Sequence, residues 1–196
     1  MYIGVLCEGG HDEIPFKIII SRLLIETFSK KEEDFSFESK TTNGSPTFID
    51  VHSNLSALLT YGCSILILTF DCDGKQKKKK NIQKIILRAM RGRTFPPENM
   101  IKILFDSEFE EWLLIDEDNI KKILCIPPDR GLSLDHTLAP KEQLNLLIDK
   151  AFRSGKLSVT ETKGSIYESI CKTLDFSKLS RNSMFRKLSS DLKLVI

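Results

Sequence analysis

The run Ser64-Ile-Leu-Ile-Leu-Thr-Phe-Asp-Cys-Asp-Gly74 decides the fold class of this chain. Its apolar residues follow one another without the polar alternation of a half-exposed strand, which is typical of a strand buried on both faces of a parallel sheet. A second run of this kind, Tyr2–Cys7, leads into Glu8-Gly-Gly10. Each run therefore predicts a buried strand that is followed at once by acidic residues.

The rest of the first half alternates between strand and helix patterns. Further strands are expected at 35–39 and 100–105, and helices at about 13–29, 47–61, 77–91 and around 108–114. Such alternation implies right-handed crossovers, and thus an α/β, Rossmann-like parallel sheet of about four strands flanked by helices. From about Glu117 the pattern changes to short amphipathic helices, expected at 141–152, 165–174 and 183–192. We therefore expect a core over 1–116 and a helical C-terminal extension over 117–196.

Composition predicts an ordinary globular protein. The chain has 196 residues, of which 41% are hydrophobic and 29% charged, enough to bury a core. No apolar run approaches the roughly 20 residues of a membrane span, and the immediate strand pattern at the N-terminus leaves no room for a signal peptide. Five cysteines without a Cys-x-x-Cys pair favour reduced thiols. We expect a cytoplasmic protein that does not bind membranes.

Charge is distributed unevenly along the chain. The segment between Gly74 and Pro97 carries nine of the 29 basic residues and none of the 27 acidic ones. Its densest part is Lys75 followed by Lys77, Lys78, Lys79 and Lys80, near the start of a predicted helix. Positive charge there opposes the helix dipole, so the lysines either form a solvated face or bind a polyanion such as a nucleic-acid backbone. Both interpretations stay open.

Acidic residues follow two predicted strands. Glu8 comes directly after the first strand, and Asp71 and Asp73 follow the central one. Ligands of open parallel sheets bind beyond the carboxyl ends of the strands, so these carboxylates are expected to converge if the strands are neighbours. Clustered carboxylates repel one another unless they are protonated or hold a cation, and Mg²⁺ (or Mn²⁺) prefers such oxygen ligands. Cys72, between the two aspartates, is expected to point into the core.

These motifs resemble the TOPRIM domain, which topoisomerases, primases, small ribonucleases and the OLD (overcoming lysogenisation defect) nucleases share. The resemblance rests on Val5-Leu-Cys-Glu-Gly-Gly-His-Asp-Glu13 and on Leu66-Ile-Leu-Thr-Phe-Asp-Cys-Asp73. A compact bacterial TOPRIM-like family is most similar, through three further segments. These are Glu108-Phe-Glu-Glu-Trp-Leu-Leu114, Ala139-Pro-Lys141 and Ser183-Met-Phe-Arg-Lys-Leu188.

The resemblance implies roles for particular residues. Glu8 would act as general acid/base or metal ligand, and Asp71 and Asp73 would hold Mg²⁺. OLD-type nucleases add a further acid and a lysine to a two-metal site; the candidates here are Glu110 (or Glu108) and Lys163. Topoisomerases carry another acid two residues after the Asp-x-Asp pair, where this chain has Lys75. This departure leaves the third metal ligand open.

The resemblance also implies an activity, namely Mg²⁺-dependent hydrolysis of phosphodiester bonds in DNA or RNA. It further implies antiviral defence in bacteria, together with an ABC-type or AAA-type ATPase partner. Topoisomerase and primase roles are disfavoured because the chain has no room for their additional domains.

Two other functions compete. Phe70-Asp-Cys-Asp-Gly74 is similar to the first motif of haloacid-dehalogenase phosphatases, in which the first aspartate, here Asp71, is a nucleophile. That motif normally follows the first strand, whereas here it lies in mid-chain and precedes Lys75. The second alternative is a non-catalytic regulatory subunit whose acidic residues only bind metal or dock a partner.

Overall fold

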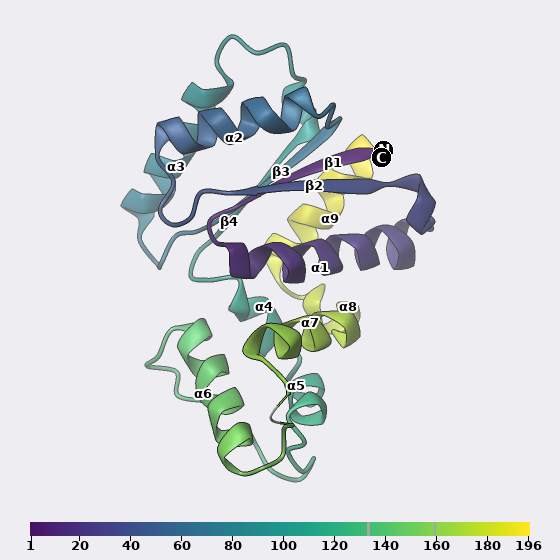
Figure 1. Cartoon of the computed structure of the whole chain (residues 1–196), viewed down its shortest axis with the longest axis vertical. Helices are drawn as coiled ribbons and strands as arrows, with labels where there is room; N and C mark the ends of the chain where they lie inside the picture. Colours follow the sequence, from purple (N-terminus) through teal and green to yellow (C-terminus); the bar gives the residue numbers. More distant parts are fainter. Residues whose placement is uncertain (133, 159) are drawn as a thin grey trace.

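A computed structural model describes residues 1–132, 134–158 and 160–196 of the chain. Its centre is a four-stranded, all-parallel sheet in the order β2-β1-β3-β4 (Figure 1). The strands are β1 (Tyr2–Cys7), β2 (Ser36–Thr41), β3 (Ile65–Asp71) and β4 (Met100–Phe105). The α/β fold class expected from the sequence, a Rossmann-like parallel sheet flanked by helices, is confirmed.

Helices connect the strands and continue after the last one. The first three are α1 (Gly10–Phe28), α2 (Phe48–Thr60) and α3 (Gln76–Met90), with one-turn 3₁₀ helices at Glu32–Asp34 and Pro97–Asn99. After β4 come α4 (Glu110–Leu114), α5 (Glu117–Ile123), α6 (Pro140–Arg153), α7 (Lys163–Thr173), α8 (Phe176–Leu179) and α9 (Ser183–Val195). Among these described residues, no helix combines the length and apolar character needed to cross a membrane.

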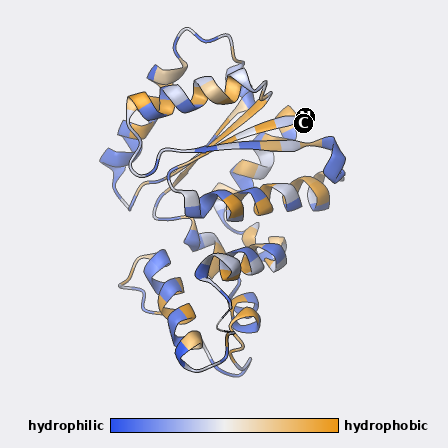
Figure 2. Cartoon of the chain, in the orientation of Figure 1, coloured by the Kyte–Doolittle hydropathy of each residue, from blue (hydrophilic) through white to orange (hydrophobic). Residues whose placement is uncertain are grey.

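Alternation along the buried strands divides the core between the two faces of the sheet. Leu6, Leu66 and Leu68 pack against α2 and α3 on one face. Ile3, Val5 and Ile67 belong to a larger cluster that includes α1 and the C-terminal helices. Figure 2 shows the resulting pattern, with mostly hydrophobic inner strands, whereas the edge strand β2 and the helices are mixed. Both faces are therefore covered, as continuous apolar strands require.

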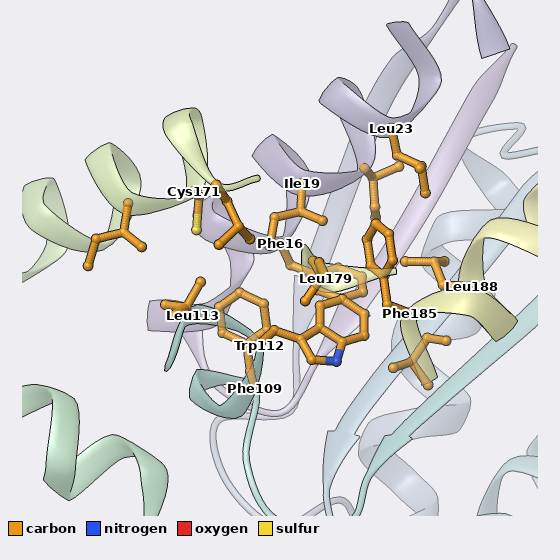
Figure 3. Packing of buried hydrophobic residues seen from close by; sticks show 14 of the residues in the cluster. Phe16, Ile19, Leu23, Phe109, Trp112, Leu113, Cys171, Leu179, Phe185 and Leu188 are labelled. Atoms are coloured by element: carbon orange, nitrogen blue, oxygen red, sulfur yellow. The ribbon is translucent and has the colours of Figure 1, made fainter. Parts of the chain in front are cut away.

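The C-terminal extension is tied to the sheet by an aromatic cluster. Trp112 of α4 is completely buried, and its ring lies 4.9 Å from that of Phe105, 6.1 Å from that of Phe16 and 5.4 Å from that of Phe185 (Figure 3). These partners come from β4, α1 and α9. The α9 helix thus returns to pack against the sheet, and α4 is fixed between the sheet and the extension.

The first helix begins three residues earlier than its pattern predicts. Its N-cap is Gly9, which has no side chain to make a capping bond, so Asp12 is the third helical residue and not the cap. An acid in the first turn complements the helix dipole, and glycine leaves the cap position open to other groups. The consequence is functional, because the Asp12 carboxyl group lies close enough to Asp71 for its charge to raise the pKa of Asp71.

Candidate functional site

Glu8 is held in place at the carboxyl end of the sheet from two sides. Its backbone carbonyl accepts hydrogen bonds from the backbone N–H of Gly44 (3.0 Å) and the hydroxyl of Thr42 (3.2 Å), both in the loop after β2. Its side-chain Oε2 accepts the backbone N–H of Asp71 at 3.2 Å. Because β1 and β3 are parallel neighbours in register at Cys7 and Thr69, the residues after each strand meet here. The predicted proximity of the two motifs is therefore found.

Lys78 bridges Glu8 and Asp73. Its Nζ lies 3.2 Å from Glu8 Oε1 and 3.2 Å from Asp73 Oδ2, and its side chain is only 17% exposed. Burial works against the ammonium form, but the two carboxylates outweigh it and raise the pKa of Lys78. The turn that presents Asp73 has a backbone φ of 49°, in the left-handed region, while Cys72 is buried as expected. A cation-binding position therefore exists between these two acids.

Asp71 is the last residue of β3, and its backbone N–H donates to Glu8. Its carboxyl group is surrounded by the acids Asp12 of α1 and Glu110 of α4, with Glu8 also nearby. Burial raises the pKa of Asp71 to about 8, and the negative charges of Asp12 and Glu110 add to the effect. Asp71, Asp12 and Glu110 thus form a group of neighbouring acids, called the acidic pocket below, which a cation would stabilise.

Glu110 of α4 is the deepest acid of this pocket, at 1% exposure. Burial raises its pKa to about 7, and the nearby positive charge of Lys141 only partly offsets this. Glu110 Oε1 accepts the hydroxyl of Tyr167 at 3.3 Å and lies 3.8 Å from Lys141 Nζ. Of the two acids left open in the sequence, Glu110 is the one that enters the pocket. The carboxylate of Glu108 instead accepts the backbone N–H of Lys141 at 2.9 Å and so anchors the start of α6.

The lysine of the pocket is Lys141 and not the expected Lys163. Burial works against the ammonium form of Lys141, but the carboxylates of Glu110 and Asp12 outweigh it and raise its pKa. Lys163, at the start of α7, forms an ion pair with Asp149 of α6 at 2.9 Å. This ion pair joins α6 to α7. One turn further along α7, Tyr167 donates a hydroxyl hydrogen bond to Glu110. The structure therefore does not bring Lys163 to Glu8 and Asp71.

The predicted nucleic-acid lysines divide into two groups. Lys75, Lys78 and Lys79 form ion pairs with Asp73, with Glu8 and Asp73, and with Asp106, respectively. Lys77 and Lys80 are exposed, with no ion-pair partner within 4 Å among the residues that the structure describes. The basic segment is therefore partly internal to the site and partly a free positive surface beside it.

Three members of the site are not identified by sequence pattern. The pattern around Asp12 predicts a helix cap, Lys141 belongs only to a tail motif, and Tyr167 has no motif at all. The signal for Asp12 is its position four residues after Glu8, in the first turn of α1. Nothing local marks the other two, because α6 and α7 reach the pocket only through the packing of the extension.

The acidic side chains, as placed, do not enclose one common point. Within 1–132, 134–158 and 160–196, no three His, Cys, Asp or Glu side chains form a ready-made metal-binding group. The physical reason is that Glu8 and Asp73 turn to Lys78, while Glu110 turns to Lys141 and Tyr167. The donor chemistry nevertheless fits Mg²⁺, because hard carboxylate oxygens repel one another there and an ammonium ion already occupies one gap.

Comparisons with known proteins add no name to this site. Neither a family model, nor a curated protein, nor a solved structure matches the chain.

Proposed function

We propose that this protein is a metal-dependent nuclease that hydrolyses phosphodiester bonds in DNA or RNA. The observation that carries the proposal is the hydrogen bond from the backbone N–H of Asp71 to Glu8. It joins acidic motifs 63 residues apart at the carboxyl edge of a parallel sheet, where ligands of such folds bind. The resemblance of both motifs to TOPRIM nucleases supports the same activity.

The charges around the site support a nucleic-acid substrate. Lys77 and Lys80 extend a positive surface outward from the acids, and a phosphate backbone is drawn to such a surface by counterion release. A metal ion that displaced Lys78 and was held by Glu8, Asp71 and Asp73 would supply the positive charge that polarises the scissile phosphate. Glu8 is fixed by two hydrogen bonds to its backbone carbonyl and by one backbone N–H to its side chain. Its carboxyl group would then accept or donate a proton at the reacting oxygen. Lys141 offers a second cation to a phosphate oxygen.

The phosphatase alternative is weakened by the position of its motif. Asp71 and Asp73 lie at the end of the third strand along the chain and precede Lys75, whereas the phosphatase motif normally follows the first strand. If the site binds metal but hydrolyses no substrate, the protein would instead be the metal-binding regulatory subunit. A single set of cleavage assays distinguishes both alternatives from the nuclease.

The decisive experiment incubates purified protein with plasmid DNA, single-stranded DNA and structured RNA, with Mg²⁺, with Mn²⁺ and with EDTA. We expect cleavage of at least one substrate that EDTA abolishes. Glu8→Ala and Asp71→Ala should remove it, and Asp129→Asn, an exposed acid elsewhere, should not. Equal products from wild type and both site variants would refute the nuclease. Hydrolysis of a simple phosphomonoester lost in Asp71→Asn would favour the phosphatase, and metal binding without any cleavage would favour the regulatory subunit.

A cytoplasmic role in bacterial antiviral defence with an ABC-type or AAA-type ATPase partner remains part of the proposal. All five cysteines are free thiols, four of them buried, which suits a reducing compartment. Phage plating on cells that express the chain with and without its neighbouring genes would test this role. Protection that needs both the ATPase gene and an intact Glu8 is the expected result.

A further inference from the structure

A cavity of about 420 Å³ lies beside the site, between α3 and α9 and over the edge strand β4. Its volume is in the range of small-ligand pockets, roughly 300–1,000 Å³. The apolar residues that line it are one each from α3, β4 and α9, and the lysines likewise come from all three elements. The apolar ones are Leu87, Leu104 and Met184, and the lysines are Lys79, Lys102 and Lys187.

Three lysines around an apolar floor define the chemistry of a ligand. Lys79 and Lys187 have acidic partners, Asp106 and Asp191, whereas Lys102 has none within 4 Å among the described residues. Leu87 is 63% exposed and Met184 is half-buried, so both apolar side chains are accessible to a ligand. A ligand that fits must present a flat or apolar group to Leu87 and Met184 and negative charge to the lysines. A nucleotide has both.

The cavity adjoins the candidate active site at Lys79. This residue also lines a small recess with Gly74 and Asp106, directly after the Asp71–Asp73 turn. Its neighbour Lys78 contacts Glu8 and Asp73. Lys79 and Leu87 are eight residues apart on α3, or about 12 Å along the helix axis. A nucleic-acid strand with one phosphate at Glu8 and Asp73 would thus reach the cavity with its next nucleotides.

We propose that this cavity is a binding subsite for single-stranded nucleic acid, which takes an unstacked base between Leu87 and Met184 and the flanking phosphates on Lys102 and Lys187. A paired base within a duplex cannot reach an apolar floor between two helices, because its faces are covered by stacking. The subsite would therefore select single strands as the substrate class of the proposed nuclease. Its biological role rests on that proposed function.

Binding without turnover tests the subsite separately from catalysis. The anisotropy of a labelled oligothymidylate is measured in EDTA over a range of salt, for the full-length wild type and its variants, with the matching blunt duplex and oligouridylate as further arms. We expect Lys102→Glu and Lys187→Glu to weaken single-strand binding about tenfold. Each should lower the salt dependence by about 0.7 in the log–log slope. Lys193→Glu, the same charge change on the exposed side of α9, should stay within about twofold.

An uncharged variant separates base contact from general electrostatics. Leu87→Asn alters an exposed side chain and no charge, so it should leave folding intact and weaken single-strand binding several-fold without changing the salt slope. Unchanged binding in Leu87→Asn and Lys102→Glu, or an equal loss in Lys193→Glu, would overturn the subsite. So would tighter binding of the duplex. If the subsite binds single strands and no substrate is cleaved with Mg²⁺, the proposed function fails while the subsite stands. If Lys102→Glu cleaves its substrate with an unaltered KM, the subsite fails while the proposed function stands.

Discussion

The ammonium group of Lys78 lies 3.2 Å from Glu8 Oε1 and 3.2 Å from Asp73 Oδ2, so one helix residue joins the acids that follow two strands. A cation is thus already present where a metal-dependent enzyme would need one. The lysine lowers the repulsion between the acids in the absence of metal. It also competes with any metal for the same oxygens.

Replacing Lys78 by Met should therefore change stability and metal binding in opposite directions. Without metal, the part-buried carboxylate of Glu8 and the exposed carboxylate of Asp73 lose their partner, and the free energy of unfolding should fall by about 1 kcal/mol, mostly through Glu8. With the competitor gone, Mg²⁺ should raise the melting temperature more than it does in the wild type. Urea unfolding in EDTA and thermal unfolding across a Mg²⁺ titration measure the two effects.

Lys80→Met is the matched control, because Lys80 is an exposed lysine two residues away on the same helix. It should change neither quantity. A Lys78→Met protein whose response to Mg²⁺ equals that of the wild type would show that the acids do not bind the metal where Lys78 now lies.

The metal-free protein should lose stability as the pH rises from about 5 to about 8. The folded-state pKa values of Asp71 (about 8) and Glu110 (about 7) are raised above their ordinary values near 4. Between these limits the folded state binds more protons than the unfolded state, so raising the pH favours unfolding. Melting temperatures in EDTA over this range measure the effect.

Asp71→Asn removes the group whose pKa is raised most, so its melting temperature should depend less on pH than that of the wild type. A wild-type curve that rises with pH over the same interval would contradict the buried acidic pocket. Glu33→Gln, at an exposed acid in the 3₁₀ turn after α1, should leave the curve unchanged.

Truncation of Trp112 should damage both the fold and the site. Its ring contacts aromatic rings from α1, β4 and α9, and Trp112→Ala should cost about 3–5 kcal/mol of unfolding free energy. Glu110 is two residues away on the same short helix, so a milder Trp112→Phe should still lower activity by displacing α4. Leu194→Ala, at an 84% exposed residue, should stay within about 0.5 kcal/mol of the wild type. Equal stability of the Trp112→Ala protein would refute the tie between extension and sheet.

Lys141 and Lys163 give a direct test of the corrected site. Lys141→Ala should lower kcat about a hundredfold, since its ammonium group adjoins the acidic pocket. Lys163→Ala should leave kcat within about twofold, because Lys163 only pairs with Asp149 on the surface. Single-turnover cleavage rates at saturating Mg²⁺ distinguish the two. The reverse order of effects would restore Lys163 as the functional lysine.

Elements decided by local pattern agree closely with the structure. Tyr2–Cys7 and Met100–Phe105 are strands with the predicted bounds, because unbroken apolar runs between glycine, proline and polar residues allow little else. Thr47 accepts the backbone N–H of Asp50 at the start of α2, and Gly62 has a φ of 82° after its end. Such signals lie within a few residues of the boundary that they set, so sequence suffices to find them.

Local pattern is enough to place Glu8, Asp71 and Asp73 at the ends of two buried strands, since hydrophobic burial forces such runs into the middle of a sheet. The partners of these acids depend instead on tertiary packing. Lys78 of α3 joins Glu8 to Asp73, α6 brings Lys141 to Glu110, and α9 completes the lysine-rimmed cavity. These contacts join residues far apart in the chain, and their geometry depends on how whole helices pack, which no local pattern encodes.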